Sequence, residues 1–470
     1  MENSKVVRIL QALEPEELRQ LGKFLRSPVH NRREDVIRLF DYILGWLKGQ
    51  RKSLQAPRVA KAVFGQAPEK MQPLHYVASY LLKVVEDFLA WREWHSDEVT
   101  RRYYLMRAYR KRHLDKPFRR TASQTRSAHD RQPLRDISYH YRRYQMMLEQ
   151  YEQAHKLGRI AEFNLQELVY AQDTTFIAEK LKNACILLSH QAVTRKDYDT
   201  GFLPQVLQYL DSRPALLEVP AIALYYFSFK ALSEVEEDHH FERLKALQRT
   251  HRRLFPLEEL QSFYTIAINY CIRRINRGEE RFLQEVFELY RSGLEEGVFL
   301  DRGIISPFTY TNIIFAGTRL NQYEWVEQFI HRYRKHLPPE QREDLFHYNL
   351  ARFHYEKGDY ERAMPLLQRI EYKDLLHNCV AKTMLAKMYY ELQELDSLSS
   401  LLQSFSVFLY RAQKLGYHRE NFLNFVRSLR RLLSLPPDRQ AADRLRTRIQ
   451  STQRITEKNW LLQQLERVKI

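Results

Sequence analysis

The chain has 470 residues, of which 44% are hydrophobic and 28% charged, and this globular composition excludes an intrinsically disordered protein. Only 13 residues are glycine; because the favoured two-residue hairpins need glycine, few β-hairpins are expected and helix is favoured. The formal net charge is +17, which bears on non-specific association rather than on fold.

The three cysteines are far apart and form no CxxC pair. This argues against a disulfide framework and a zinc site, and it suits a reducing compartment. The N-terminal stretch lacks the apolar core of a signal peptide. The longest apolar run, Ala221 to Phe229, is too short to span a bilayer. We therefore expect a cytoplasmic protein that makes no membrane contact.

Residues 1–116 are expected to form an N-terminal helical module. Pro15 and its neighbouring acids indicate a helix start, because proline is tolerated in the first turn and acids favour the positive end of the helix dipole. The next segment has apolar residues three and four positions apart, which predicts one buried helical face: Val36, Leu39, Phe40, Ile43, Leu44 and Leu47. Residues 74–94 predict a further helix.

Most of the net charge lies in residues 101–144, which contain 14 Lys and Arg against 3 Asp. Within this segment, the polar composition of 117–134 predicts a basic, flexible linker. Arginine alternates with tyrosine in "RRYYLMRAYRKR" and "YHYRRYQ", and such a segment can pair with phosphates and stack on bases. The candidate polyanion-binding residues are Arg101, Arg102, Arg110, Lys111, Arg112, Arg119, Arg120, Arg142 and Arg143.

From Asp136 onwards one helix pattern follows another, and an internal repeat is visible. One copy contains Leu350, Ala351, Gly358, Tyr360, Ala363 and Leu367. A second copy, 35 residues later, contains Leu385, Ala386, Gln393, Leu395, Leu398 and Leu402. A third copy, 37 residues before the first, contains Ile313, Asn321, Tyr323, Val326 and Ile330, and is followed by Pro338.

This pattern resembles the tetratricopeptide repeat. The small residues Ala351 and Ala386 let paired helices approach closely, and the turn position takes glycine or a tolerant polar residue, namely Gly358, Asn321 or Gln393. The pattern departs from the family in four places. Val326 and Leu398 stand where a small residue is usual, and Gly317 and His354 stand where a large ring is usual.

The resemblance implies an all-α fold, with a right-handed solenoid of antiparallel helix pairs over 135–430 and the clearest repeats at 307–410. Residues 431–470 are expected to form capping helices, with Trp460 and Leu461 docked on the last repeat. The whole chain is also similar to long, uncharacterised helical-repeat proteins of the Bacteroidota, through "KFLRSPVHN", "YCIRRINRGEERFL" and "FAGTRLNQYEWVEQFI". That similarity implies the same architecture and no particular activity.

The sequence carries no HExxH, P-loop, GxGxxG or GxSxG motif. Asp238, His239 and His240 form a triplet used by some metal phosphoesterases, but such sites need further ligands from sheet edges, so a solvated turn is expected. We therefore expect no catalytic, cofactor-binding or metal-binding residues and no enzymatic activity. An enzyme hidden in the solenoid stays a third alternative.

In tetratricopeptide-type folds the first helix of each pair lines a concave groove. The positions that the repeat frame places there are Thr311, Phe315, Arg319, Tyr348, Arg352, Tyr355, Thr383, Lys387 and Tyr390. The candidate partner-binding residues among them are Arg319, Tyr348, Arg352, Tyr355, Lys387 and Tyr390. The leading hypothesis is a non-enzymatic scaffold that binds a protein or peptide through this groove. The alternatives are a nucleic-acid-associated protein using 101–144, and an ordinary solvated groove face.

Overall fold

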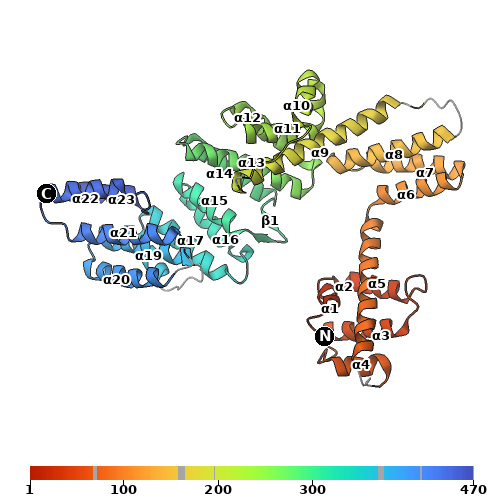
Figure 1. Cartoon of the computed structure of the whole chain (residues 1–470), viewed down its shortest axis with the longest axis horizontal. Coiled ribbons are helices and arrows are strands. Elements are labelled where there is room, and N and C mark those ends of the chain that lie inside the picture. The colour runs from red at the N-terminus through yellow and green to blue at the C-terminus, as the bar shows by residue number, and fades with distance from the viewer. Residues whose placement is uncertain are drawn as a thin grey trace. The chain divides into compact units, whose positions relative to one another are not determined.

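The computed structural model describes residues 1–66, 71–156, 163, 165–194, 196–368, 375–412, 415 and 417–468. Helices make up 79% of the chain, so the all-α prediction is confirmed (Figure 1). The chain divides into two compact units, Met1–Ile177 and Ala178–Ile470. The division falls inside a helix and not at the predicted linker 117–134.

The first unit is built from consecutive helices. They are α1 (Lys5–Gln11), α2 (Pro15–Arg26), α3 (Glu34–Leu47), α4 (Ala56–Phe64), α5 (Gln72–Ser96), α6 (Glu98–Lys111), α7 (Asp115–Asp130) and α8 (Ile137–Lys156), followed by α9 (Leu165–Thr194), in which the division lies. The predicted helix start at Pro15 is confirmed, and of the predicted face Val36, Leu39, Phe40 and Ile43 are buried while Leu44 and Leu47 are half-buried. One apolar core contains residues of α1 to α5.

The second unit continues with helices in sequence. They are α10 (Leu203–Ser212), η1 (Pro214–Glu218), α11 (Pro220–Ser233), α12 (Asp238–His251), η2 (Arg252–Leu254), α13 (Leu257–Asn276), α14 (Arg281–Glu295), α15 (Pro307–Arg319), α16 (Tyr323–Tyr333), η3 (Arg334–His336), α17 (Arg342–Lys357), α18 (Tyr360–Gln368), α19 (Leu375–Glu391), α20 (Leu395–Arg411), α21 (Tyr417–Leu433), α22 (Arg439–Ser451) and α23 (Lys458–Arg467). A short antiparallel hairpin of β1 (Leu300–Asp301) and β2 (Ile304–Ile305) precedes α15.

The prediction of a flexible linker at 117–134 is wrong, because most of that stretch is α7. Its buried residues recur three and four positions apart: Phe118, Thr121, Ala122, Thr125, Ala128 and His129. These side chains are mostly small, so counting only large apolar residues misses the buried face. The helix packs against α6 and α8.

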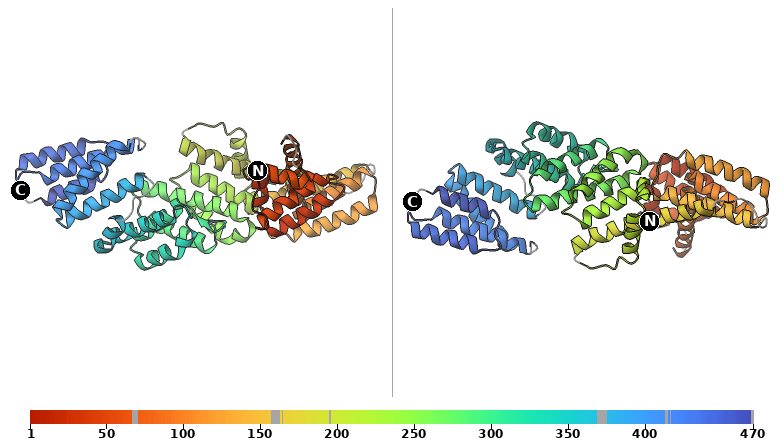
Figure 2. Two further views of the ribbon diagram at one scale, coloured as in Figure 1. Left: turned by 90° about the horizontal axis from the view of Figure 1, so that it is seen from below. Right: turned by 90° about the horizontal axis from the view of Figure 1, so that it is seen from above.

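Consecutive helices of the second unit pack in pairs, such as α13 with α14, α15 with α16, α17 with α18 and α19 with α20. The views in Figure 2 show these helical hairpins. First helices of successive pairs also touch: α11 with α13, α15 with α17, and α17 with α19. This packing is what a helical repeat requires. The predicted limits of a solenoid at 135–430 and of a cap at 431–470 stay predictions.

The turns between paired helices fall where the sequence pattern predicts them. Asn321, Gly358 and Gln393, the three predicted turn positions, all have positive φ, at 57°, 80° and 60°. Gly278, with φ of 91°, occupies the same place between α13 and α14. A left-handed residue ends one helix and reverses the chain within a few residues. The small residues Ala351 and Ala386 are fully buried, as the repeat requires.

No helix within the described ranges combines the length and apolar character that a bilayer span needs.

Candidate functional site

A cavity of about 260 Å³ opens between α15 and α17, the first helices of two successive pairs. Its lining consists of Ile314, Phe315, Thr318, Arg319, Asn321, Tyr323, Arg352, Phe353 and Glu356. Phe315, Thr318 and Arg319 share one face of α15, because residues three and four apart are neighbours on a helix. The predicted partner-binding residues Arg319 and Arg352 therefore line one site.

The cavity combines a ring with two guanidinium groups. Phe315 is 40% exposed, and the Arg352 guanidinium carbon lies 5.3 Å from its ring centroid, within cation–π range. Arg319 is more than half exposed and pairs loosely with Glu280, at 3.6 Å between Nη2 and Oε1. The arrangement suits an acidic group beside an apolar one.

Thr318 is a cavity-lining residue that the repeat frame did not identify. Its side chain is 7% exposed, and its Oγ1 has no hydrogen-bond partner among the described residues. An unpaired buried hydroxyl costs about 1–3 kcal/mol, and because this oxygen is itself enclosed, Thr318 forms part of the cavity wall rather than a hydrogen-bonding group for a ligand. The signal that could have found it is its place three residues after Phe315, on the same helical face.

Tyr348 and Lys387, two other predicted partner-binding residues, are not accessible. Tyr348 is buried and its ring stacks on His377, with centroids 4.4 Å apart. Lys387 is 9% exposed, and its Nζ lies 2.8 Å from Glu457 Oε2. The prediction that these two side chains contact a partner is wrong for this conformation, because the chain itself covers them.

The covering element near Lys387 is the start of α23. Lys387 Nζ lies 5.5 Å from the Trp460 ring centroid and 5.2 Å from that of Tyr355. The Trp460 indole donates to Glu391 Oε1 at 2.6 Å, and Tyr390 meets Trp460 edge to face at 5.5 Å. Tyr355 and Tyr390, both predicted for partner binding, are thus partly buried in the chain's own core.

The predicted docking of Trp460 and Leu461 is confirmed, since both are buried in one core with residues of α19, α20 and α21. Residues far along the sequence therefore contact the predicted groove positions: the Glu457 carboxylate pairs with Lys387, and the Trp460 ring packs against Tyr390. The groove face that stays open is the one around Phe315.

Four of the nine predicted polyanion-binding residues pair with carboxylates inside the protein, and a fifth, Arg101, donates to a backbone carbonyl. Arg110 makes a two-pronged contact with Glu149, at 2.6 and 3.2 Å, and this hydrogen bonding raises the pKa of Arg110. The other pairs are Arg102 with Glu98 at 2.8 Å, Arg142 with Asp97 at 2.7 Å, Arg143 with Glu167 at 2.7 Å, and Arg101 with the His95 carbonyl at 3.2 Å.

The remaining four cations lie around the turn between α6 and α7. Lys111, Arg112, Arg119 and Arg120 are exposed, and none has an ion-pair partner among the residues that the structure describes. Arg112 donates to the Ala108 carbonyl at 3.1 Å. Within the predicted segment 101–144, these four cations are therefore available to a ligand, as are Lys116, Arg126 and Arg131, which are also exposed and have no ion-pair partner among the described residues.

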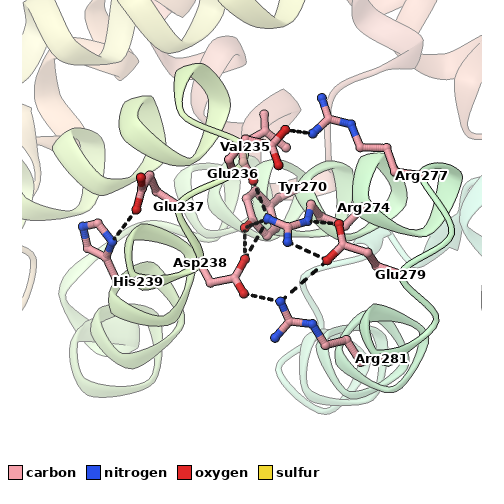
Figure 3. Close-up of polar contacts among 10 residues, drawn as sticks. All are labelled: Val235, Glu236, Glu237, Asp238, His239, Tyr270, Arg274, Arg277, Glu279 and Arg281. Carbon is pink, nitrogen blue, oxygen red and sulfur yellow. Dashed lines mark hydrogen bonds and ion pairs between the residues drawn. The ribbon is translucent and has the colours of Figure 1, made fainter.

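A dense ion-pair network joins the α11–α12 turn to the α13–α14 turn (Figure 3). Arg274 is 6% exposed, donates to the Val235 carbonyl at 2.7 Å and pairs with Asp238 and Glu279. Tyr270 donates to Asp238 Oδ1 at 2.8 Å. Since the buried guanidinium is satisfied on several sides, the network serves to tie adjacent helix pairs together.

The Asp-His-His triplet is part of this region. Asp238 also pairs with Arg281, and His240 is 8% exposed, with Nε2 lying 2.8 Å from Glu234 Oε2. The prediction of a solvated turn therefore fails for His240 and for Asp238, while His239 is largely exposed. Within the described ranges, no three His, Cys, Asp or Glu side chains converge as metal ligands would.

Two of the cysteines are inert by position. Cys185 and Cys271 are buried, and burial raises the pKa of both thiols. A thiol in such surroundings stays protonated at neutral pH and is a poor nucleophile.

Comparison of the chain with known protein families, with curated proteins and with solved structures found no match.

Proposed function

We propose that the protein is a non-enzymatic scaffold and that the cavity between α15 and α17 is its peptide-binding site. One observation carries the proposal: Arg319 and Arg352 line one cavity together with the exposed ring of Phe315. The ligand that fits is an extended partner segment with an Asp or Glu beside an apolar side chain. The carboxylate pairs with a guanidinium, and the apolar group packs on Phe315.

The helix pairs and left-handed turns support a repeat architecture, and we extend it to a solenoid whose concave face includes this cavity. In such folds adjacent first helices present side chains along a continuous face. The site then recognises a segment and not a folded surface, because it is a short trough between two helices.

The test compares proteins recovered with tagged full-length chain carrying Arg319→Glu and Arg352→Glu. Reversing both charges replaces attraction of an acidic segment by repulsion, so recovery is expected to fall about tenfold or more. The matched control is Arg332→Glu with Lys335→Glu, which changes net charge equally at exposed residues outside the cavity. Unchanged recovery with the cavity variant, in samples treated with nuclease, would exclude this groove.

A second candidate function rests on the four exposed cations at the α6–α7 turn, which we propose as a polyanion contact. Four phosphate contacts give a slope of about −3 to −4 when log K is plotted against log salt. Arg119→Glu with Arg120→Glu should weaken binding of a duplex oligonucleotide and flatten that slope. A salt-independent signal, or one that these changes leave intact, rejects the contact.

A further inference from the structure

The N-terminal unit carries a second groove, between α2 and α3, with a volume of about 520 Å³. This size lies within the range of about 300–1,000 Å³ that is typical of binding pockets. Helix α2 lines the groove with one face, whose residues are three or four positions apart, and with two neighbours of that face: Pro15, Leu18, Gly22 and Arg26, then Arg19 and Lys23. Helix α3 and the residue after it supply the other wall: Phe40, Asp41, Leu44, Leu47 and Lys48. Because Pro15 and Arg26 are eleven residues apart at 1.5 Å each, the groove runs for roughly 16 Å.

The floor of this groove is apolar and open. Leu18, Leu44 and Leu47 are only partly buried, although they pack on the core of the unit. Gly22 lies between them without a side chain, and a Cβ there would lie 3.4 Å from the Phe40 ring. Glycine inside a helix costs about 1 kcal/mol relative to alanine. The space that a side chain at Gly22 would take is filled by the Arg26 guanidinium, which donates to the Gly22 carbonyl at 2.9 Å.

The rims of the groove are cationic on both sides. Lys23 on α2 and Lys48 at the end of α3 are exposed, and neither has an ion-pair partner in the described part of the chain. The acid in the lining, Asp41, is held by Arg26 through two hydrogen bonds of 2.7 and 2.8 Å. The groove therefore offers free positive charge on either side of an apolar strip.

We propose that this groove binds an acidic amphipathic helix of a partner protein. The helix lays apolar residues at i, i+3 or i+4, and i+7 along the strip formed by Leu18, Leu44 and Leu47, which is how grooves between two helices receive a third. Asp and Glu on its flanks face Lys23 and Lys48. The charge pattern selects this occupant, because a basic or neutral helix of equal hydrophobicity gains nothing from the rims.

The proposal goes beyond the peptide site in the second unit and is independent of it. The experiment displays a library of helical peptides of about 16 residues, long enough to exceed the groove at 1.5 Å per residue. Apolar residues are fixed along one face, and Glu, Lys and Gln vary elsewhere. The library is selected on the immobilised full-length chain and then bound to variants of it.

The expected pool is enriched in Glu, and Lys23→Glu with Lys48→Glu weakens its binding about tenfold or more. Lys61→Glu with Lys83→Glu, an equal charge change at exposed residues outside the groove, leaves binding within about twofold. Leu18→Glu places a carboxylate on the apolar strip and also abolishes binding, with its helix content checked by circular dichroism. A pool without acidic bias, or one that the rim variant still binds, overturns the proposal. So does self-association of the chain that the rim variant abolishes.

Discussion

Replacing Gly317 by alanine should destabilise the second unit, although the same change stabilises most helices. A methyl group at Gly317 would lie 2.5 Å from Val326 Cγ2 and 2.8 Å from Phe287 Cε2. Neither neighbour can swing away, since Val326 and Phe287 are at most 2% exposed. The tetratricopeptide pattern has a large ring at the position of Gly317 and a small residue at the position of Val326. Here the small residue and the large one are interchanged, so that Val326 fills the space that the missing ring would occupy.

The magnitude follows from two opposing effects. Alanine gains about 0.5–1 kcal/mol over glycine through backbone entropy, while overpacking a well-filled core costs about 1–3 kcal/mol. With two clashes against fixed side chains, we expect a net loss of about 1–2 kcal/mol. In a unit of this size, that lowers the melting temperature by roughly 2–3 °C.

Thermal and denaturant unfolding followed by circular dichroism measure the effect. Gly22→Ala is the matched control, because its added Cβ would meet the flexible end of Arg26 at 3.2 Å and the Phe40 ring at 3.4 Å. That variant should melt at or above the wild-type temperature. Val326→Ala should partly rescue Gly317→Ala, with a coupling energy of about 1–2 kcal/mol. A Gly317→Ala protein as stable as wild type, or strictly additive losses, would refute the size-exchange argument.

Two further perturbations probe other parts of the chain. Trp460→Ala should cost about 3–5 kcal/mol, as for other large buried rings, and should uncover Lys387; an unchanged unfolding midpoint of the second unit would contradict the docking seen here. Burial, helped by the nearby charges of Arg143, His129 and Arg135, lowers the pKa of His140 from 6.5 to about 4. Between pH 6.5 and 4, His140 is therefore protonated in the unfolded chain and neutral in the folded one. The free energy of unfolding falls as the pH drops through this range, by at most about 1.4 kcal/mol per pH unit. His140→Gln should flatten that slope in denaturant titrations at pH 7 and pH 5, and an identical slope in both proteins would show that His140 does not contribute.

Local rules were enough to predict the helices and the turns between paired helices. Turn residues at Asn321, Gly358 and Gln393 were predictable because few residue types tolerate a left-handed backbone. The helix at 115–130 was not predicted because most of its buried face is made of threonine and alanine, which pack closely but do not give the segment an apolar composition. The apparent misfits Gly317 and Val326 could be paired only once their contact was seen.

Two of the six candidate partner-binding residues lie on a common accessible face. The repeat frame places Arg319 and Arg352 on one face, and the structure brings both to one cavity. The same frame cannot anticipate that Glu457 returns to Lys387, since that contact joins residues 70 positions apart. The terminal helix α23 and Glu457 before it cover α19, the first helix of the last pair. The repeat pattern predicts the position of Lys387 on α19 but not its burial.

The net charge of a sequence segment also misleads, because residues outside the segment can neutralise it in the folded protein. This affects which surface is available to a charged ligand. The basic excess of 101–144 is reduced by carboxylates that all lie outside that segment: Asp97, Glu98, Glu149 and Glu167. An ion pair that is already made offers little to a phosphate. Lys23 and Lys48, in contrast, have no ion-pair partner among the described residues and lie beside an apolar strip. A cation without a partner next to exposed apolar surface selects an acidic, amphipathic ligand more sharply than a larger number of paired arginines does. The overall charge of +17 therefore favours acidic protein segments at the two grooves, with the α6–α7 turn as a part of 101–144 where a polyanion would find several free cations together.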